Sequence, residues 1–590
     1  MPEYLAPGVY VEETSFRAKS IEGVGTSTTA FVGPTRKGPY RVDADTPEPC
    51  ELLTSYGDFE RIYGGYEDLV LGGAATTNFL AQAVLAFFNE GGVRLYVSRV
   101  VGATPASATV EVKTGTDEGV HFNARFPGAC GNGSIVAREV ATPVSAIGMT
   151  NAPEGTLLRS GSGNALAFHV KVGSDWRPAA DTTQAAADAT ALAGATPFIL
   201  TLALQAVDGG GSTLSYDQLG FDRTHPRWVG HVLAAVPARR SDHLQNLFEI
   251  DIGANVSAIE LHDALFTGST ANAAGEQERP WVLAGGADGA EPTDTEYALA
   301  LQEVAGLEDV AIVAAPGSSA YTAGNTQDPL ANSQAIANAL IAHAEARRAY
   351  RIAVLDTPPE QMPSEARTYR GLFDSRYAAL YYPWMVVTNP LARAGREDIP
   401  REIALPPSGA VCGIYARNDV ERGVYKAPAN EVVRSALRFE IDVNFGQQEM
   451  LNPLGVNCLR YLSGRGFRVW GARLASSDPE WKYVSDRRYF NYLEASIDRG
   501  TQWAVFEPNG QNLWSNITQT ISQFLYTEWR NGALLGASQE EAFFVRCDRS
   551  TMTQNDLDNG RLVCLIGVAI IKPAEFVVFR IGQKTADARS

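Results

Sequence analysis

Asp356 is the residue of this sequence that comes nearest to a catalytic position. It follows an apolar run at residues 352–355 that has the composition of a buried strand. An acid at the end of such a strand can move a proton or hold a cation in an α/β enzyme. Thr357, Pro358 and Pro359 come directly after it, and the sequence offers it no candidate partner. We therefore predict that Asp356 does not support catalysis.

Other patterns that could do chemistry are incomplete. The turn at residues 464–467 lacks the third glycine of GxGxxG and is followed by no βαβ frame, so a tight turn between strands is favoured. No GxxxxGK(S/T), HExxH, GxSxG or CxxC motif occurs, and the six cysteines are scattered. The seven histidines have no metal-ligand spacing. We predict no catalytic, cofactor-binding or metal-binding residues and no cofactor.

A dense run of arginines lies between residues 460 and 488, with aromatic residues interleaved. Such a run can bind nucleic acid. Acidic residues lie in the same run, and the whole chain has 49 Lys and Arg against 67 Asp and Glu, a net charge of −18, so no nucleic acid partner is predicted. An interface between proteins or an internal ion-pair network is favoured instead. The residues of this possible intersubunit basic patch are Arg465, Arg468, Arg473, Arg487 and Arg488.

The elements that would position these residues indicate several domains, since 590 residues are too many for one. Strands at 309–314 and 351–355 flank a helix at 332–348, which predicts a right-handed crossover in a parallel sheet. Alternating apolar residues predict a half-buried strand at 437–443, and one-sided apolar faces predict helices at 487–499 and 512–530.

We expect an α/β and α+β multidomain fold with a β-rich insertion and extended arms. The insertion is predicted where the sequence becomes rich in Ala, Gly, Thr and Asp. The expected parts are an N-terminal arm and linker at 1–29, an α/β middle domain at 30–100 with 281–369, an inserted outer β-rich domain at 101–280, a C-terminal domain at 370–572 and a C-terminal arm at 573–590.

The helix at 512–530 has two different faces. Its apolar face is formed by Leu513, Trp514, Ile517, Ile521, Phe524 and Leu525, with Asn512 as a plausible N-cap. Its polar face carries Asn516, Gln519, Gln523 and Arg530. The apolar face predicts packing against the domain core, and the polar face is either a contact surface or an ordinary solvated face.

Both ends of the chain carry an apolar strand on a polar or flexible lead. Residues 8–13 include Val9, Tyr10, Val11 and Glu12, and residues 575–580 include Phe576, Val577, Val578 and Phe579. An isolated strand leaves its backbone groups unpaired, so each needs the edge of a host sheet. That sheet is in the same domain or in a neighbouring copy of the chain.

No apolar run approaches the roughly 18 residues that span a bilayer, so no direct membrane insertion is predicted. The first residues have neither a basic region nor a long apolar stretch, unlike a secretory signal. We expect synthesis and assembly in a cytoplasm.

Several short sequence blocks occur in order along the chain. They are APGVYVEE at 6–13, FPG at 126–128 with GN at 131–132, LAGGADG at 283–289, PPSG at 406–409, GIYARND at 413–419, RGVYKAPAN at 422–430, LNPLGVN at 451–457, VWGARL at 469–474, WKYV at 481–484 and RR at 487–488. In their number and order these blocks resemble the contractile tail-sheath family. The match runs from residue 6 to residue 488, and no family pattern is found between about 140 and 280.

The resemblance implies a structural protein and not an enzyme. Sheath subunits of this family stack as six-fold rings into a helical tube around an inner tube protein, with baseplate and terminal cap proteins at the ends. Terminal arms exchange strands between subunits, and contraction needs no cofactor. The implied roles here are strand exchange for both apolar ends, inner-tube contact for the polar face of 512–530, and a flexible lead at 14–29.

Two alternatives stay open at this stage. One is a shell or assembly protein that does not contract, and the other is an oligomeric α/β enzyme using Asp356. Within the sheath interpretation, the sequence does not distinguish a phage tail from a bacteriocin-like particle or a cell-anchored injection system. It also does not identify the trigger or the role of residues 101–280.

Overall fold

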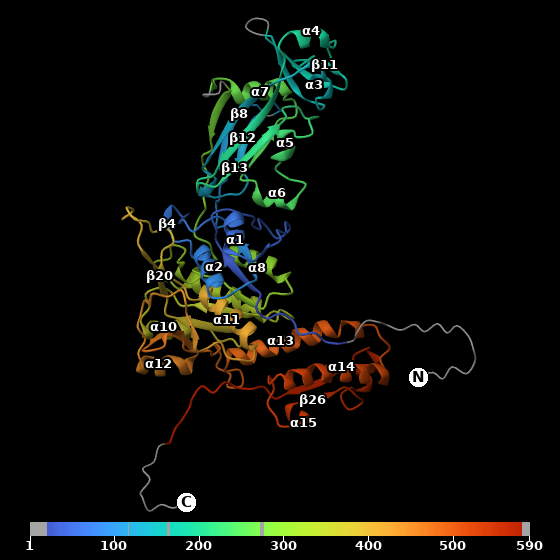
Figure 1. Cartoon of the computed structure of the whole chain (residues 1–590). Helices are drawn as coiled ribbons and strands as arrows, with labels where there is room; N and C mark the ends of the chain where they lie inside the picture. The colour runs from blue at the N-terminus through green and yellow to red at the C-terminus, as the bar shows by residue number, and fades with distance from the viewer. Residues whose placement is uncertain (1–19, 116, 162–165, 272–275, 581–590) are drawn as a thin grey trace, which may run out of the picture.

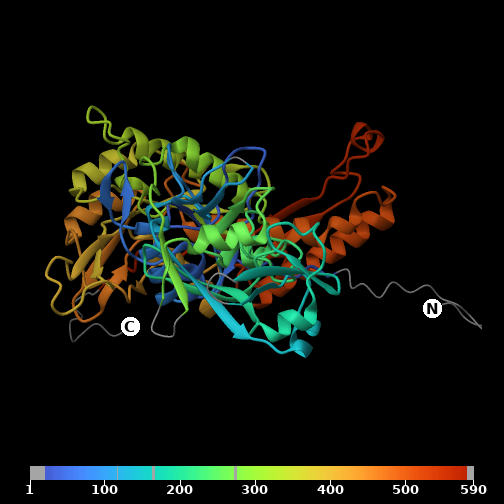
Figure 2. The ribbon, with the colours of Figure 1, turned by 90° about the horizontal axis from the view of Figure 1, so that it is seen from above.

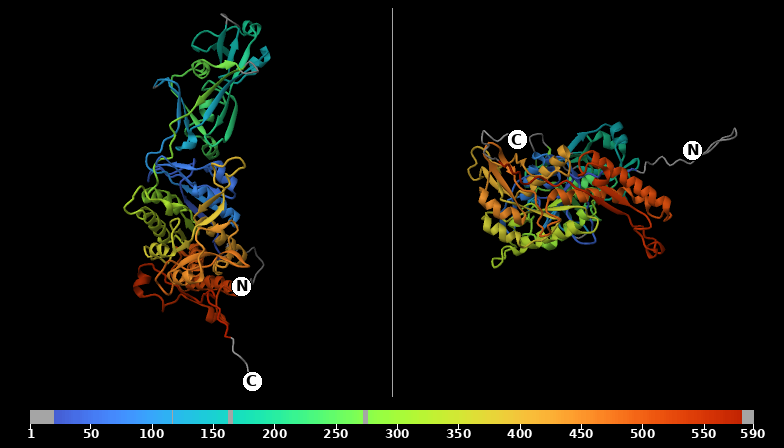
Figure 3. Two further views of the ribbon diagram at one scale, coloured as in Figure 1. Left: turned by 90° about the vertical axis from the view of Figure 1, so that its left-hand side faces the viewer. Right: turned by 90° about the horizontal axis from the view of Figure 1, so that it is seen from below.

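The computed structural model describes residues 20–115, 117–161, 166–271 and 276–580. The molecule is elongated and has three tiers, as Figure 1 shows: the insertion at one end, a large sheet with its helices in the middle, and a helical pair at the other end. Figure 3 shows the same tiers from the side. The expected α/β and α+β multidomain fold is confirmed. The predicted strand at 8–13 lies outside the described residues.

The middle tier is built on a nine-stranded sheet of order β2-β5-β1-β17-β18-β19-β24-β25-β22. The six strands from β5 to β24 are parallel, and antiparallel strands close both edges. The bounds are β2 (Leu52–Leu53), β5 (Leu95–Arg99), β1 (Thr29–Gly33), β17 (Ile312–Ala314), β18 (Ile352–Asp356), β19 (Ala378–Tyr382), β24 (Val456–Leu462), β25 (Gly466–Val469) and β22 (Glu431–Val432).

Helices cover both faces of this sheet, which is why its central strands are apolar throughout. Phe31 of β1 points into one core, and its neighbours Ala30 and Val32 point into the other. The first face is covered by α2 (Phe79–Asn89) and α11 (Ser408–Arg422), with α1 (Tyr56–Tyr63) nearby. The second is covered by α8 (Asp294–Ala305), α9 (Ala331–Glu345) and α10 (Pro363–Arg370). The predicted β-α-β connection between parallel strands is confirmed as β17-α9-β18, with Ile312 in register with Ile352, while its right-handedness stays a prediction.

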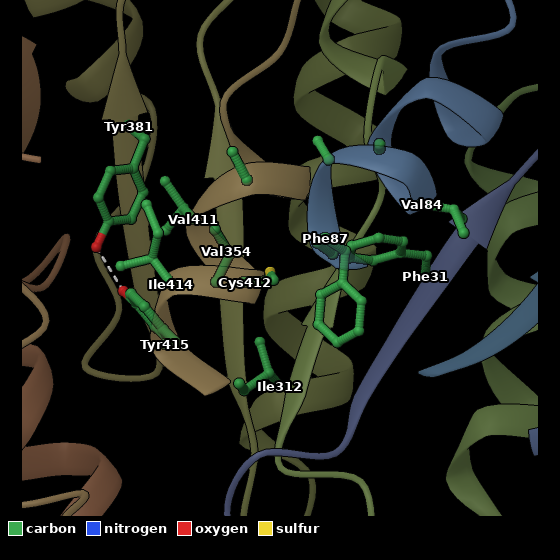
Figure 4. Close-up of a cluster of buried hydrophobic side chains, with 14 of the residues drawn as sticks. Phe31, Val84, Phe87, Ile312, Val354, Tyr381, Val411, Cys412, Ile414 and Tyr415 are labelled. Carbon is green, nitrogen blue, oxygen red and sulfur yellow. Dashed lines mark hydrogen bonds between the residues drawn. The ribbon is translucent and has the colours of Figure 1, made fainter. Parts of the chain in front are cut away.

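Helix α11 is buried almost all round, between α2 and the sheet. A Cβ added at Gly409 would lie 2.6 Å from the Cβ of Ala83, and one at Gly413 would lie 2.4 Å from the carbonyl oxygen of Phe87. The two glycines therefore let the helix axes approach closely. Figure 4 shows Val411, Ile414 and other side chains of α11 packed among those of α2 and the strands.

The insertion contains an eight-stranded sheet of order β11-β10-β9-β12-β8-β16-β15, with β13 paired to β12, and a three-stranded sheet of order β14-β7-β6. The bounds are β6 (Thr109–Lys113), β7 (Val120–Ala124), β8 (Ser134–Pro143), β9 (Leu157–Ser160), β10 (Ala167–Val172), β11 (Asp175–Pro178), β12 (Phe198–Val207), β13 (Thr213–Leu219), β14 (Phe248–Ile252), β15 (Thr270–Ala271) and β16 (Gln277–Val282). The longest helix described in this region, α7 (Ala258–Phe266), begins with a Ser257–Glu260 capping box.

The third tier consists of α13 (Val484–Gly500), α14 (Gln511–Arg530) and a hairpin of β26 (Phe543–Arg546) and β27 (Leu565–Val568). Seen from above, this tier projects to one side of the body (Figure 2). Both helix predictions are confirmed, and all six predicted apolar residues of α14 are buried. The N-cap is Gly510 and not Asn512.

The strand predicted at 437–443 is largely wrong. Only β23 (Arg438–Phe439) forms, paired with β20 (Met385–Thr388), which also pairs β21 (Glu402–Leu405). Beyond Met385, the residues of the partner strand that would continue this ladder are Trp384 and Pro383. Pro383 has no N–H to donate, so the pairing ends there. The chain then enters α12 (Phe445–Leu451) through its Asn444 cap. The domain boundary at 370 stays a proposal, since the nine-stranded sheet takes strands from both sides of it.

Candidate assembly surfaces

Asp356 anchors a helix. It lies at the carboxyl end of β18 and is buried, and it accepts hydrogen bonds from the backbone N–H of Ser408 at 2.8 Å and from the Ser408 hydroxyl at 2.5 Å. Ser408 is the first residue of α11, so the carboxylate satisfies donors at a helix N-terminus. Burial raises the pKa of Asp356 to about 7 despite these two bonds. The partner that the sequence did not reveal is thus a structural one.

Three of the five predicted patch arginines are buried inside the subunit. Arg488 donates to both oxygens of Asp419, at 2.8 and 2.6 Å, and its guanidinium lies 4.8 Å from the ring centre of Tyr415. Arg487 donates to Asn491 and Glu494. These arginines belong to an internal ion-pair network, which was the alternative to a surface patch.

Arg473 is also buried and pairs with Glu575. Arg465 is exposed and Arg468 is half-buried, and both donate to Asn430. The five arginines therefore do not form one surface on this subunit. A role of Arg465 and Arg468 in an interface stays a prediction.

The polar face of α14 is free on the subunit surface. Asn516, Gln519, Gln523 and Arg530 are all exposed, on the side of the helix opposite to the buried residues. Its apolar face packs with Tyr489 and Leu493 of α13 in one core. The structure thus leaves this face available for a partner.

The C-terminal arm contains four consecutive apolar residues with large exposed fractions. These are Phe576 at 71%, Val577 at 67%, Val578 at 77% and Phe579 at 83%. They form no strand, and no backbone hydrogen bond joins residues 576–579 to any part of the chain that the structure describes. Four adjacent large apolar side chains in water are unusual for a monomer and indicate a surface that another chain covers.

The hairpin β26–β27 has unpaired outer edges along Phe543–Arg546 and Leu565–Val568, as far as the described residues extend. Phe544, Leu565 and Ile566 are exposed on it. A two-stranded sheet gains stability from further strands. The hairpin is therefore a candidate acceptor for an arm.

The flexible lead predicted at 14–29 is wrong for residues 21–28. The N–H of Val24 donates to Ser496, the carbonyl of Thr26 accepts from Arg488, and the Thr26 hydroxyl donates to Asp419 at 2.6 Å. Ile21 is buried beside Gly500 at the end of α13. The lead is therefore bound along α13 from Ile21 onward, and residues 14–19 of the predicted lead lie outside the described residues.

Across the described ranges, no helix is long and apolar enough to cross a membrane. The same ranges contain no group of three or more His, Cys, Asp or Glu residues arranged to hold a metal ion.

Residues 290–473 match the phage tail sheath protein central domain, and residues 476–584 match the phage tail sheath C-terminal domain. The chain belongs to the tail sheath family. A putative prophage major tail sheath protein of Pseudomonas aeruginosa is 26% identical to it over 276 residues, 46% of this chain and 64% of that relative. The chain thus matches less than two thirds of this relative's length.

Two solved structures have the same fold along almost their whole length. The sheath complex of the extracellular contractile injection system PVC, in its contracted state, is 18% identical, with a TM-score of 0.52, and covers 99% of both chains. The helical sheath of the anti-feeding prophage, also contracted, is 19% identical with a TM-score of 0.52, and covers 98% of this chain and 99% of that one. The resemblance seen in the sequence is confirmed at the level of family and fold.

Proposed function

We propose that this protein is the structural subunit of a contractile sheath and not an enzyme. Copies would stack as six-fold rings around an inner tube protein, and contraction of the sheath would drive that tube through a target envelope. The observation that carries this proposal is the exposed apolar segment at residues 576–579, in a chain that also presents an unpaired hairpin edge.

The proposed contact is the addition of an arm strand to the β26–β27 hairpin of a neighbouring copy. Each backbone hydrogen bond gained contributes roughly 0.5–1.5 kcal/mol, and burial of alternate side chains adds to it. Because arm and hairpin are different surfaces, the contact is heterologous and extends into a ring or a helix. We assign the same role to Val9, Tyr10, Val11 and Glu12 of the N-terminal segment.

The exposed face of α14 is the proposed contact with the inner tube protein. Amide side chains such as Gln519 and Gln523 form weak polar contacts, which separate readily when a sheath widens. Baseplate and terminal cap proteins would complete the assembly, which we place in the bacterial cytoplasm before its release as a tail or particle. Neither nucleic acid nor a cofactor has a part in this proposal.

The test replaces all four residues Phe576, Val577, Val578 and Phe579 with serine in the full chain. We expect a folded subunit with an unchanged urea midpoint that forms no hollow striated cylinders by negative-stain electron microscopy. The control replaces Val236 and Val282, two exposed valines on the insertion and its last strand β16, with serine. It should form cylinders like the native chain. Cylinders of normal length from the fourfold variant would refute the proposed role of the arm.

A further inference from the structure

Glu575, the residue directly before the exposed apolar segment, lies in a cage of four side chains. Arg473 donates to it from Nε at 2.8 Å and from Nη2 at 2.7 Å, Asn452 donates at 2.8 Å, and the Tyr483 hydroxyl donates at 2.9 Å. The Lys482 ammonium is 3.4 Å away. All of these donors come from the central and C-terminal parts of the fold, distant in sequence from the arm.

Contacts that do not involve Glu575 also hold the cage in place. Arg473 is buried, its N–H donates to Asn457 at 2.6 Å, and its Nη1 donates to the carbonyl of Asn452. Asn457 is fully buried in β24 and donates to the carbonyl of Leu380 in β19. Arg473 is thus fixed beside the central sheet, and the Nε and Nη2 donors of its guanidinium form a bidentate site that fits a carboxylate.

The charges match this geometry. Arg473 and Lys482 face a single carboxylate, and the side chain of Glu575 is only 19% exposed. Burial alone would raise the pKa of Glu575, but the hydrogen bonds from Arg473, Asn452 and Tyr483 outweigh it and lower the pKa to about 2. The carboxylate is therefore charged and bound at neutral pH.

The arm runs from the hairpin of its own subunit to the cage and continues away from that hairpin (Figure 1). Only residues 569–574 separate β27 from Glu575, a connection short enough to let a strand fold back on β27. Instead, Ile570 is bridged to Leu534, and the chain then runs beneath the middle tier before it leaves the body (Figures 1 and 3). The exposed segment begins at the cage and not at the hairpin.

We propose that Glu575 is a positioning residue that prevents the C-terminal arm from closing on its own β27 and directs it to the hairpin of a neighbouring copy. This rests on the proposed function, since it presupposes that the arm exchanges between copies. Glu575, the anchor, would keep segment 576–579 from pairing with β27 of the same chain, so that the segment stays available to another copy. It also connects a docked arm to the central sheet through Arg473 and β24.

Of residues 571–580, Ile571, Pro573 and Glu575 are half-buried and the others are exposed. Without the Glu575 contacts, the packing of Ile571 and Pro573 would have to hold the arm, and release of residues 571–575 would add roughly 17 Å to its reach. An arm that pairs with its own subunit is no longer available to a neighbour. The apparent affinity between copies therefore falls in proportion to the fraction of subunits whose arm stays open.

The experiment compares Glu575→Gln with the native full chain and with the control Glu480→Gln, an exposed glutamate close to the cage in sequence. Hydrogen exchange at residues 576–579, which have no backbone hydrogen bond within the described residues, is measured in dilute subunits, and the concentration needed for cylinder assembly is measured by light scattering. In Glu575→Gln we expect exchange at these residues at least threefold slower, because the segment pairs with its own hairpin, and a threshold concentration at least threefold higher, because fewer arms are open. The control should match the native chain in both.

Arg473→Gln provides a double-mutant cycle. If the two residues act as one unit, adding Arg473→Gln to Glu575→Gln raises the assembly threshold little further. A native threshold and native exchange in Glu575→Gln would overturn the inference. If the fourfold serine variant also assembles normally, the proposed function of the arm fails as well; if that variant does not assemble, the failure is confined to the anchor.

Discussion

Arg488 and Asp419 form a buried ion pair that joins three distant segments. Their side chains are 3% exposed each, and Thr26 contributes a hydroxyl to Asp419 and a carbonyl to Arg488. This pair holds the N-terminal lead and α11 against α13. At the scale of single residues, this pair is one example of how arginines of the run at 460–488 stabilise the interior of the subunit.

Arg488→Ala should lower the free energy of unfolding by about 3–5 kcal/mol, because it leaves the buried Asp419 carboxylate without its partner. Urea unfolding of the purified subunit measures this. Arg468→Ala, a less buried arginine of the same run, should change it by less than about 0.5 kcal/mol. Equal effects of the two substitutions would contradict the assignment of Arg488 to the interior.

Asp356 should make the subunit less stable as the pH rises. Its pKa in the folded chain is about 7, above that of an unfolded aspartate, so the folded state binds the proton more tightly. Its contribution to stability is therefore complete below about pH 4 and declines until about pH 7, by about 1.4 kcal/mol per pKa unit.

Asp356→Asn should remove this decline, because asparagine keeps an oxygen for Ser408 and does not titrate. Urea midpoints between pH 4 and 8 give the slope for each variant. Asp217→Asn, at an exposed position, should keep the native slope. A variant at position 356 with the native slope would assign the pH dependence to another group.

At the scale of elements, the buried face of α14 should contribute to the stability of the subunit, and its exposed face is the one we propose for assembly. Ile521→Ala empties a buried position and should cost about 2–5 kcal/mol in urea unfolding. Gln519→Ala with Gln523→Ala should change stability by less than about 0.5 kcal/mol. If the exposed face contacts the tube, the glutamine variant should co-sediment several-fold less with the cognate inner tube protein. Native co-sedimentation would place that contact elsewhere.

The arm segment 576–579 differs from α14 in where its apolar residues lie within the described part of the subunit. The apolar residues of α14 find a core in the same chain, whereas those of residues 576–579 do not. A strand needs partners for its backbone groups, and a helix satisfies its own. Arms that would add as strands are therefore suited to the proposed contact between copies, and in our proposal the Glu575 cage sets where that contact begins.

At the scale of the whole molecule, the insertion is joined to the body through two antiparallel chain crossings, where Ala106 is bridged to Ala287 and Thr109 to Ala284. Ion pairs between Lys37 and Asp208 and between Arg240 and Glu48 add to this connection between the insertion and the body. Its core is separate from the two cores of the central sheet.

Replacing residues 110–283 with a short Gly-Ser linker should therefore leave a folded body that still assembles. The paired positions Thr109 and Ala284 are adjacent, so a few residues close the gap. Circular dichroism and electron microscopy of the shortened chain measure folding and assembly. A chain that folds but forms no cylinders would assign the insertion to the contacts between copies.

Elements with a local pattern could be predicted from the order of neighbouring residues. These are the apolar stripe of residues 512–530, the buried strands around α9 and the apolar run at residues 576–579. The family blocks likewise lie in continuous segments, and four of them contain Ser408, Asp419, Asn452 and Arg473. They indicated the family but not what these side chains contact.

The long-range pairings, and the elements without a local pattern, could not be predicted and were seen first in the fold. Helix α11 is apolar or small on nearly every side, so it has no stripe for a periodicity to detect. Asp356 meets Ser408 across 52 residues, Arg488 meets Asp419 across 69, and Glu575 meets Arg473 across 102. The physical reason is that such contacts depend on how the sheet brings distant strands and helices together, which no local spacing specifies.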